Sequence, residues 1–269
     1  MAVFDRVIAD LLEEKGSFDQ YFDMMDDKPH RDIFGVALVD CDAGNIGHTL
    51  TIRRDDDHVD SHDPSLYFTK EPFEHEAALL HRAAERVLDV GCGAGRPLLW
   101  LKQRGVNVTG IDLSPGAIDV CRRRGCEDVR LVDIMSSATE TLKDAEFQTA
   151  VLFGNNVGIV GTLDGARHFF RRLARAMYPD GHLPITGLDI AQTCDPRHLT
   201  YHQWNRVLGR PIGEITMRFE NQDMIGSWVR WFYPTPDELR EIAVETGWSV
   251  KELGSTYGPF YSAVLGKLS

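Results

Sequence analysis

Hydrophobic positions in this chain follow two alternating periodicities from about residue 86 onward. Short runs of β-branched and apolar residues, typical of buried strands, lie at 87–90, 106–112, 129–134, 147–153 and 182–189. Segments with apolar residues at every third or fourth position lie between them, at 97–104, 115–124 and 163–177. Alternation of strands with helices predicts a parallel sheet whose crossovers are right-handed.

The sequence before this core is less regular. Residues 2–15 have a helical period and precede Phe18, Tyr21 and Phe22, so we expect an amphipathic cap that packs on the core or serves as a lid. A hairpin that includes a strand at 49–52 is expected, and a helix over 71–84. We therefore divide the chain into a cap or lid segment, 1–70, and a core domain, 71–269.

The fifth strand of the core is introduced by a predicted turn at 178–181, and its Pro184 lacks the N–H that a central strand needs. An insertion at 190–234 follows. It is predicted to contain a helical or irregular segment, 196–208, and a hairpin formed by 214–220 and 226–233. Thr235 then begins a helix to about 246, before two last strands at 248–253 and 260–265.

Composition narrows the functional classes. The hydrophobic and charged fractions, 43% and 26% of 269 residues, are those of a soluble globular protein, and no apolar run is long enough to span a bilayer. Acidic residues near the N-terminus argue against a secretory leader, so cytoplasmic residence is expected. The net charge of −12 disfavours nucleic-acid binding, and five cysteines without a C-x-x-C pair disfavour a zinc ribbon or disulfide framework.

The segment with the most chemical information is Asp89-Val90-Gly91-Cys92-Gly93-Ala94-Gly95. A strand, a glycine-rich turn and a helix start form the place where α/β folds bind nucleotide-like ligands. A dinucleotide fingerprint would need a third glycine at Arg96. The observed D-x-G-x-G-x-G instead resembles motif I of the class I S-adenosylmethionine (SAM)-dependent methyltransferases, over roughly residues 70–268. In this comparison Asp89 would attract the cationic methionine end of SAM.

The resemblance implies a set of SAM-binding residues. Asp112 ends the second strand about 20 residues after the first glycine, where a carboxylate accepts both ribose hydroxyls. Asp133 would contact the adenine amine and Ile134 its ring. Asn155 and Asn156, after the fourth strand, would hold the methionine end or the substrate, or simply form a turn. The full expected set is Asp89, Gly91, Cys92, Gly93, Gly95, Asp112, Leu113, Asp133, Ile134, Asn155 and Asn156.

The acceptor side is less clearly marked. The fourth strand leads into Gly154-Asn155-Asn156-Val157, which differs from the [D/N]-P-P-[Y/F] motif of methyltransferases that act on base amines. His202 is the candidate general base, with Tyr201 beside it, because histidine titrates near neutrality. Candidate substrate contacts are Tyr67, Trp204, Trp228 and Trp231.

No metal is expected. The acids and histidines between Asp55 and Asp63 are crowded in a loop and are interpreted as a solvated acidic segment. A metal-assisted, catechol-type arrangement of Asn155 and Asp189 is also rejected, because Asp189-Ile190 departs from the Asp-Asn pair of that family.

Together these features predict a Rossmann-like α/β protein. Its seven-stranded, mostly parallel sheet would have helices on both faces and an antiparallel last strand between the fifth and sixth. The expected function is methyl transfer from SAM to the oxygen, nitrogen or carbon of a small molecule, by a monomer or homodimer. The alternatives are an NAD(P)-dependent oxidoreductase and a non-catalytic SAM-binding module.

Overall fold

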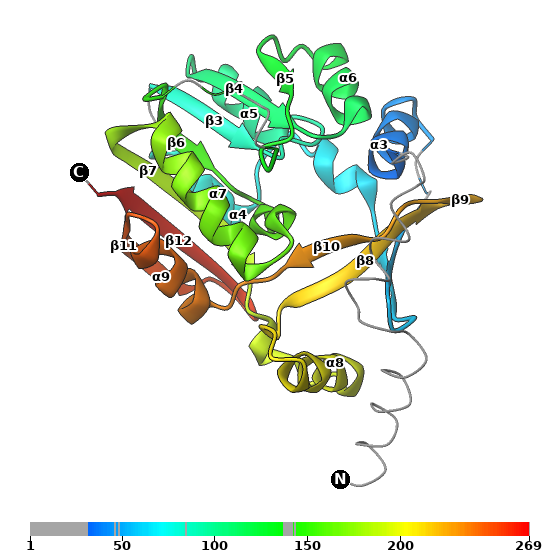
Figure 1. Ribbon diagram of the computed structural model, residues 1–269. Coiled ribbons are helices and arrows are strands. Elements are labelled where there is room, and N and C mark those ends of the chain that lie inside the picture. Colours follow the sequence, from blue (N-terminus) through cyan, green and yellow to red (C-terminus); the bar gives the residue numbers. More distant parts are fainter. Residues whose placement is uncertain are drawn as a thin grey trace, which may run out of the picture.

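The central element of the fold is a seven-stranded sheet (Figure 1). The computed structural model describes residues 32–268, apart from 46, 48, 84, 137–141 and 143. The strand order is β11-β12-β7-β6-β3-β4-β5. The strands are β3 (Arg86–Val90), β4 (Asn107–Asp112), β5 (Val129–Leu131), β6 (Phe147–Val151), β7 (Met177–Leu188), β11 (Trp248–Ser255) and β12 (Phe260–Lys267). β12 is antiparallel to both of its neighbours, β11 and β7, and the other pairs of neighbouring strands in this sheet are parallel, which confirms the predicted topology.

Helices cover both faces of this sheet because successive strand residues point in opposite directions. Leu88 and Val90 pack in one buried cluster with α7 (Leu163–Ala176) and α9 (Pro236–Glu245). Val87 packs in a second cluster with α4 (Glu74–Leu80) and α5 (Arg96–Lys102). The helix α6 (Pro115–Arg123) contacts β4 and β5, and Ser114 is its N-cap because the Ser114 hydroxyl accepts from the N–H of Ala117.

A second, antiparallel sheet lies beside the first and was not predicted as a unit. Its order is β10-β8-β1-β2, and β9 also pairs with β8. The expected hairpin forms β1 (Leu50–Arg54) and β2 (Val59–His62). The 190–234 insertion forms β8 (Glu214–Asn221), β9 (Met224–Ile225) and β10 (Val229–Phe232). Because β1 pairs with β8, the N-terminal segment and the insertion form one structure.

Short helices connect the two sheets. They are α3 (Ile33–Asp42), which packs on α6, and the 3₁₀ turns η1 (Pro64–Phe68), η2 (Asn156–Val160) and η3 (Ile190–Gln192), together with the helix α8 (Pro196–Val207) in the insertion. The expected helix at 2–15 and the aromatic group Phe18, Tyr21 and Phe22 lie outside the described residues.

The predicted turn at 178–181 is wrong. Met177 to Leu188 is one strand, and the register against β6 shifts between the pairs Phe147–Met177 and Thr149–His182, so the extra residues form a bulge. Pro184 lies just beyond it. Its carbonyl accepts from Leu152 N, and the pairing with β6 resumes only at the isolated bridge of Leu152 with Ile185. The bulged ladder therefore accommodates the missing N–H.

Two other expected elements are shorter in the structure. The third strand stops at Leu131, so Asp133 and Ile134 follow the strand and Ser136 N donates to Asp133 O. The helix expected over 71–84 spans Glu74–Leu80.

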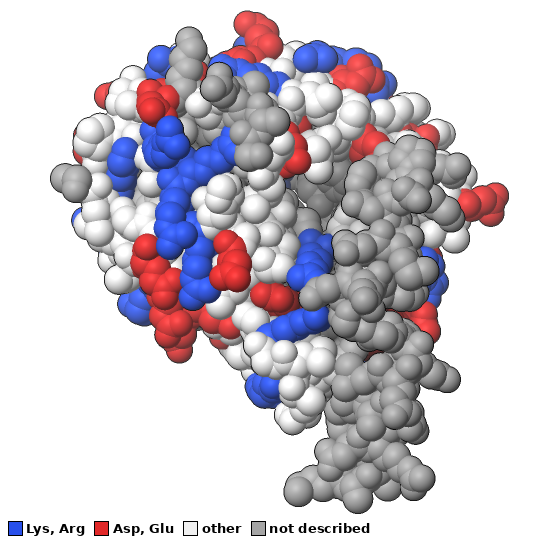
Figure 2. All heavy atoms as spheres, in the orientation of Figure 1, with Lys and Arg blue, Asp and Glu red and all other residues white. Residues whose placement is uncertain are grey.

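Basic side chains gather over α7 in Figure 2, and acidic side chains flank them. Arg167 of this helix pairs with Asp164 and Glu245, so part of the stripe is neutralised within the molecule. Among the described residues, no helix has the length and apolar character required to cross a bilayer.

Candidate functional site

The candidate site begins at the turn formed by residues 91–95, which we call the glycine turn. All three of its glycines have positive φ, 73° at Gly91, 54° at Gly93 and 79° at Gly95. Other residues rarely adopt this conformation. At Gly95, the N-cap of α5, a Cβ would also lie 2.8 Å from Sγ of Cys126. The glycines are therefore required by the backbone, and they leave it open to a ligand.

Asp112, at the end of β4, is bound directly to this turn. Its Oδ2 accepts from Gly93 N at 2.9 Å and its Oδ1 accepts from Ser114 N at 2.9 Å. Burial raises the pKa of this carboxyl, and the two N–H donors oppose the rise. The structure thus brings the two predicted acids, Asp89 and Asp112, to the same edge of the sheet.

Asp89 is almost fully buried, with 2% of its surface exposed. Burial raises its pKa to about 8; nearby Arg96 lowers it, while Glu76 and Asp112 raise it further. Its Oδ2 has no hydrogen-bond partner among the described residues. A buried carboxylate oxygen without a donor is costly, and it marks a place where a cationic or N–H group of a ligand would fit.

In the described part of the chain, the buried guanidinium of Arg96 has donors without partners, which complement the unpartnered acceptor of Asp89. Its Nη2 donates to Oε1 of Glu76 at 2.8 Å, and the ring of Phe73 lies 4.1 Å from its central carbon. Its Nε and Nη1 have no hydrogen-bond partner in the part of the chain that the structure describes. Arg96 and Asp89 therefore offer two donors and one acceptor close together, which suits the carboxylate and ammonium groups of an amino acid.

The segment after β6 supports the turn from the other side. Nδ2 of Asn156 donates to the carbonyls of Val90 at 2.9 Å and Gly91 at 2.7 Å. Asn155 has a positive φ of 66°, and its buried Oδ1 has no partner among the described side chains and backbone groups. Asn156 therefore fixes the turn, while Asn155 presents an acceptor to the adjoining space.

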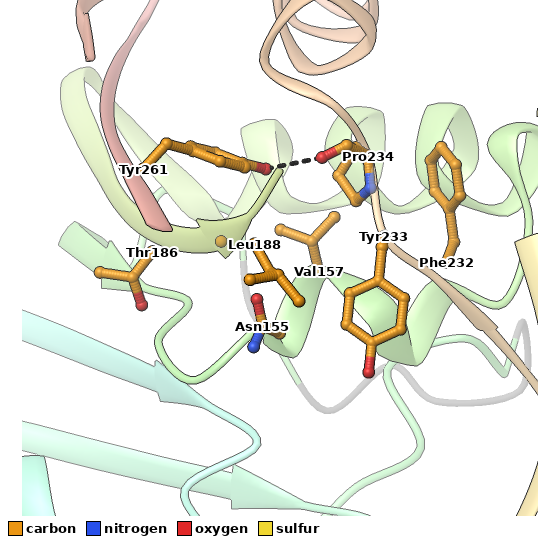
Figure 3. Close-up of a pocket in the computed structure, with 9 residues that line it drawn as sticks. Asn155, Val157, Thr186, Leu188, Phe232, Tyr233, Pro234 and Tyr261 are labelled. Atoms are coloured by element: carbon orange, nitrogen blue, oxygen red, sulfur yellow. Dashed lines mark hydrogen bonds between the residues drawn. The ribbon is translucent and has the colours of Figure 1, made fainter. Parts of the chain in front are cut away.

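That space is a small pocket at the ends of β6 and β7 (Figure 3). Its free volume of about 10 Å³ has room for about one water molecule. Apolar and aromatic groups dominate its walls, which are formed by Asn155, Val157, Thr186, Gly187, Leu188, Phe232, Tyr233, Pro234 and Tyr261. Tyr261 donates to the Pro234 carbonyl at 3.0 Å, so its hydroxyl is already used.

Tyr67 of η1 covers the glycine turn. A Cβ at Gly93 would lie 3.2 Å from its ring, and its hydroxyl is 3.1 Å from Nε2 of His62. Burial raises the Tyr67 pKa to about 12; Asp112 and Tyr233 also raise it, and Arg96 lowers it. Burial lowers the pKa of His62, so its imidazole is neutral at pH 7. Tyr67 and His62 thus connect the glycine turn to β2 of the second sheet.

Comparisons with known proteins agree with this geometry. A family model described as a methyltransferase domain matches residues 87–181. A SAM-dependent methyltransferase from Bacteroides fragilis, solved in complex with S-adenosylhomocysteine, is 26% identical with a TM-score of 0.76, over 90% of this chain and 98% of that one. Residues 87–181 thus match a methyltransferase domain, and the chain as a whole shares the fold of a SAM-dependent methyltransferase.

Two curated relatives match parts of this chain. The methyltransferase GfsG of Streptomyces halstedii is 29% identical over 42% of this chain and 41% of its own length. The mitochondrial ubiquinone biosynthesis O-methyltransferase of Schizosaccharomyces pombe is 25% identical over 66% of this chain and 60% of its own length. The match therefore spans less than two thirds of either relative.

Tyr201 and His202, the predicted catalytic residues, lie on α8, well apart from the glycine turn in Figure 1. The Tyr201 hydroxyl donates to Asp55 at 2.9 Å and accepts from Thr216 N at 3.2 Å, so it ties α8 to the second sheet. Burial, then Arg206 and His198, lower the pKa of His202 to about 4. A catalytic role for either residue stays a prediction.

The other predicted contacts divide between the two sheets. Trp231 packs on Gly158 of η2, beside the asparagines, and its Nε1 has no partner among the described residues. Trp204 stacks edge-on against Tyr201, and Trp228 lies under Arg218.

Three of the predicted SAM contacts differ in exposure. Leu113 is 67% exposed next to Asp112, whereas Ile134 is buried in the core. The side chain of Cys92, within the glycine turn, is buried against the thiols of Cys121 and Cys126.

Sequence reasoning missed Glu76, Arg96 and His62. Arg96 was noted only as the absence of a third glycine, although an arginine directly after a glycine turn is itself a signal for an anionic ligand group. Glu76 and His62 become recognisable only through their partners, which lie on other elements.

Proposed function

We propose that this chain binds SAM along the carboxyl edge of β3, β4 and β6 and transfers its methyl group to a small molecule. The observation that carries the proposal is the pair of unmatched groups at Asp89 and Arg96. The methionine end of SAM has an α-ammonium, which would bind Asp89, and an α-carboxylate, which would bind Arg96. The nicotinamide cofactors have no such amino-acid end.

The remainder of SAM fits the same edge. Asp112 is positioned for the ribose hydroxyls and the exposed Leu113 for the face of the adenine, while Asp133 remains the proposed adenine contact. The sulfonium makes the methyl group electrophilic, so these residues contribute by orientation. The nucleophile of the acceptor forms its bond to the methyl carbon while the carbon–sulfur bond breaks, and S-adenosylhomocysteine is released.

The pocket in Figure 3 has room for only about one water molecule, so an acceptor would enter it only if its walls moved apart. Those walls are mostly apolar and aromatic, which suits a small, largely apolar acceptor. The printed names of relatives from Idiomarina loihiensis and Schizosaccharomyces pombe, both ubiquinone biosynthesis O-methyltransferases, make hydroxylated aromatic compounds a reasonable first panel. A neutral His62, hydrogen-bonded to Tyr67 above the glycine turn, would accept the proton that a hydroxyl acceptor loses.

Calorimetry with the full chain tests the proposal. We expect S-adenosylhomocysteine and SAM to bind one per chain, and NADH not to bind. Binding of NADH without SAM would instead support a dinucleotide oxidoreductase. Labelled-methyl transfer to a panel of phenols, amines and carbon acids then tests catalysis, because tight SAM binding without transfer to any acceptor would favour a non-catalytic module.

Two histidine variants distinguish the candidate bases. We expect His62→Asn to lower kcat at least tenfold with unchanged affinity for S-adenosylhomocysteine, because it removes the proton acceptor beside Tyr67. His202→Asn is the matched comparison. If His202→Asn lowers kcat and His62→Asn does not, the base is on α8, as the sequence alone suggested.

A further inference from the structure

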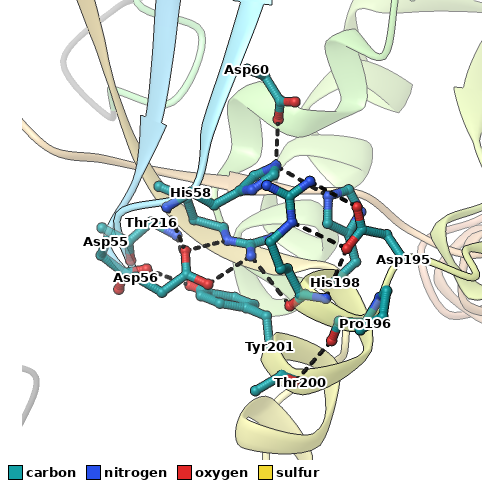
Figure 4. A network of polar contacts seen from close by, with 12 residues as sticks. Asp55, Asp56, His58, Asp60, Asp195, Pro196, His198, Thr200, Tyr201 and Thr216 are labelled. Carbon is teal, nitrogen blue, oxygen red and sulfur yellow. Dashed lines mark hydrogen bonds and ion pairs between the residues drawn. The ribbon is translucent and has the colours of Figure 1, made fainter.

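A cluster of two histidines and an aspartate joins α8 to the β1–β2 hairpin (Figure 4). His58 comes from the turn of the hairpin, Asp60 from β2, and His198 from the first turns of α8, 140 residues later. Nε2 of His58 lies 3.2 Å from Nε2 of His198 and 3.2 Å from Oδ2 of Asp60. All three ligand atoms lie within 4.8 Å of one another.

Hydrogen bonding alone satisfies this cluster poorly. If Nε2 of His58 carries a proton, it can donate to His198 or to Asp60, and the other acceptor is left over. If it carries none, His198 can donate to it, but Asp60 then has no donor from His58, and the proton of His58 lies on its buried Nδ1, which has no partner among the described residues. A cation between the three atoms would accept a lone pair from each of them.

The spacing fits a small transition-metal ion. Tetrahedral zinc with metal–nitrogen bonds of ~2.0–2.1 Å has ligand–ligand edges of ~3.3–3.4 Å. Both short edges at His58 are 3.2 Å. The third edge can close because the Asp60 side chain is 62% exposed and free to shift, whereas His58 is held with 5% of its side chain exposed.

The surrounding charge also favours a cation. Four acids (Asp55, Asp56, Asp60 and Asp195) lie around the histidines in Figure 4, and Arg54 and Arg197 interact with the same group, a sum of −2 when the histidines are neutral. Both arginines are occupied by other acids of the group, since Arg54 binds Asp56 at 2.7 Å and Arg197 binds Asp195 at 2.9 Å. Asp60 is therefore left to the histidines.

We propose that His58, Asp60 and His198 bind a divalent transition-metal ion, with zinc as the best match and water as the fourth ligand. Two imidazoles and one carboxylate form a typical zinc ligand set. The ion would fasten α8 to the β1–β2 hairpin, next to the tie that Tyr201 makes between α8 and Asp55. This site is separate from the proposed SAM site, and it revises the expectation of a solvated acidic loop.

Metal titration of the full chain tests the proposal. After treatment with a chelator and dialysis, we expect zinc chloride to bind one per chain in calorimetry, to raise the Tm by several degrees, and to leave the affinity for S-adenosylhomocysteine unchanged. Cobalt at the same site should give the visible absorption of a tetrahedral ion. No binding, or no more than weak binding at several sites, would overturn the proposal.

Variants locate the ion. His198→Asn removes a partly buried ligand, and we expect the zinc affinity to fall more than about 100-fold, beyond the cost of losing an outer-shell partner. Asp60→Asn changes an exposed side chain and carries the test if His198→Asn misfolds; it should lower affinity at least about tenfold. His168→Asn, on the exposed face of α7, removes an imidazole that is not part of the cluster and should leave the zinc affinity unchanged. Equal affinity in all three variants would contradict the assignment.

Discussion

Asp89 shows how a single residue can be tuned for a ligand at the expense of stability. Its carboxyl has one oxygen without a donor and a pKa near 8 in a fully buried position. Since the same group ionises near pH 4 in the unfolded chain, folding takes up a proton between these values. The stability that this proton uptake provides is complete below about pH 4 and is lost as the pH rises towards 8.

We therefore expect Asp89→Asn to have opposite effects on stability and binding. Between pH 6 and pH 8.5 the free energy of unfolding of the variant should rise by about 2 kcal/mol relative to that of the native chain, because the amide cannot ionise. Its affinity for SAM should fall about 10–100-fold. Urea unfolding at both pH values and calorimetry check this; a constant difference in stability across the range would contradict the buried titration.

Arg96 gives the complementary prediction. Arg96→Gln removes the two unmatched guanidinium donors, so we expect the affinity for S-adenosylhomocysteine to fall about 10–100-fold. Arg104→Gln is the matched control, since that arginine lies just beyond α5 and stacks on Trp100 away from the turn. Equal affinities in the two variants would remove Arg96 from the ligand site.

At the residue scale, the sequence identified the groups whose partners are close along the chain. Asp89 and Gly91 to Gly95 lie in one motif, and Asp112 follows at a recognisable spacing. The pairs Glu76 with Arg96 and His62 with Tyr67 depend on which side chains the fold brings together. His58 and His198 are separated by 140 residues, so no spacing rule could relate them.

At the scale of elements, close backbone contact decides how α3 sits on α6. Asp32, the N-cap of α3, accepts from Gly35 N at 2.9 Å and from both Ser114 Oγ and Gly116 N of the other helix start. The two helix starts share one carboxylate, and this is possible because Gly116 has no side chain. A Cβ there would lie 2.6 Å from the carbonyl carbon of Gly35.

Gly116→Ala should therefore destabilise the protein by about 1–3 kcal/mol, because α3 must move away from α6. Gly254→Ala is the matched control. A Cβ at Gly254 meets no atom within 4 Å, so its effect should stay within about 0.5 kcal/mol. Urea denaturation measures the free energy of unfolding of both variants. Equal destabilisation would show that the close contact between Gly116 and Gly35 does not cause the effect.

The core elements could be predicted because their patterns are local. Strands bounded by glycine turns and the helix that begins at Thr235 follow from short stretches of sequence. The bulge in β7 could not be predicted, because Tyr178-Pro179-Asp180-Gly181 has strong turn chemistry and only the register of β6 keeps it in a strand.

At the scale of the whole molecule, the second sheet joins regions that are far apart in sequence. β1 pairs with β8 between Thr51–Glu220 and Arg54–Met217, and Arg53 binds Glu220 at 2.8 Å across that pairing. The sequence indicated both hairpins but not their partnership, since pairing over about 165 residues leaves no periodic signal. Through η1 and Tyr67, this sheet is connected to the glycine turn.

Ligand binding should therefore slow amide exchange in the second sheet. On adding S-adenosylhomocysteine, we expect amide exchange in η1 and β1 to slow at least about tenfold, because Tyr67 would close on the bound molecule. Peptides from α9 and β11, on the other side of the main sheet, serve as the internal control. Uniform protection, or protection of the glycine turn alone, would show that the second sheet does not respond.

The position of β12 has a consequence for synthesis. This strand lies between β7 and β11 but is translated after both. While a nascent chain still lacks residues 260–267, one edge of the 12-residue strand β7 has no partner. Open strand edges pair with other chains, so ribosomes that stall in this interval would expose an aggregation-prone intermediate. The time from translating β7 to translating β12 sets how long chaperones must shield the growing chain.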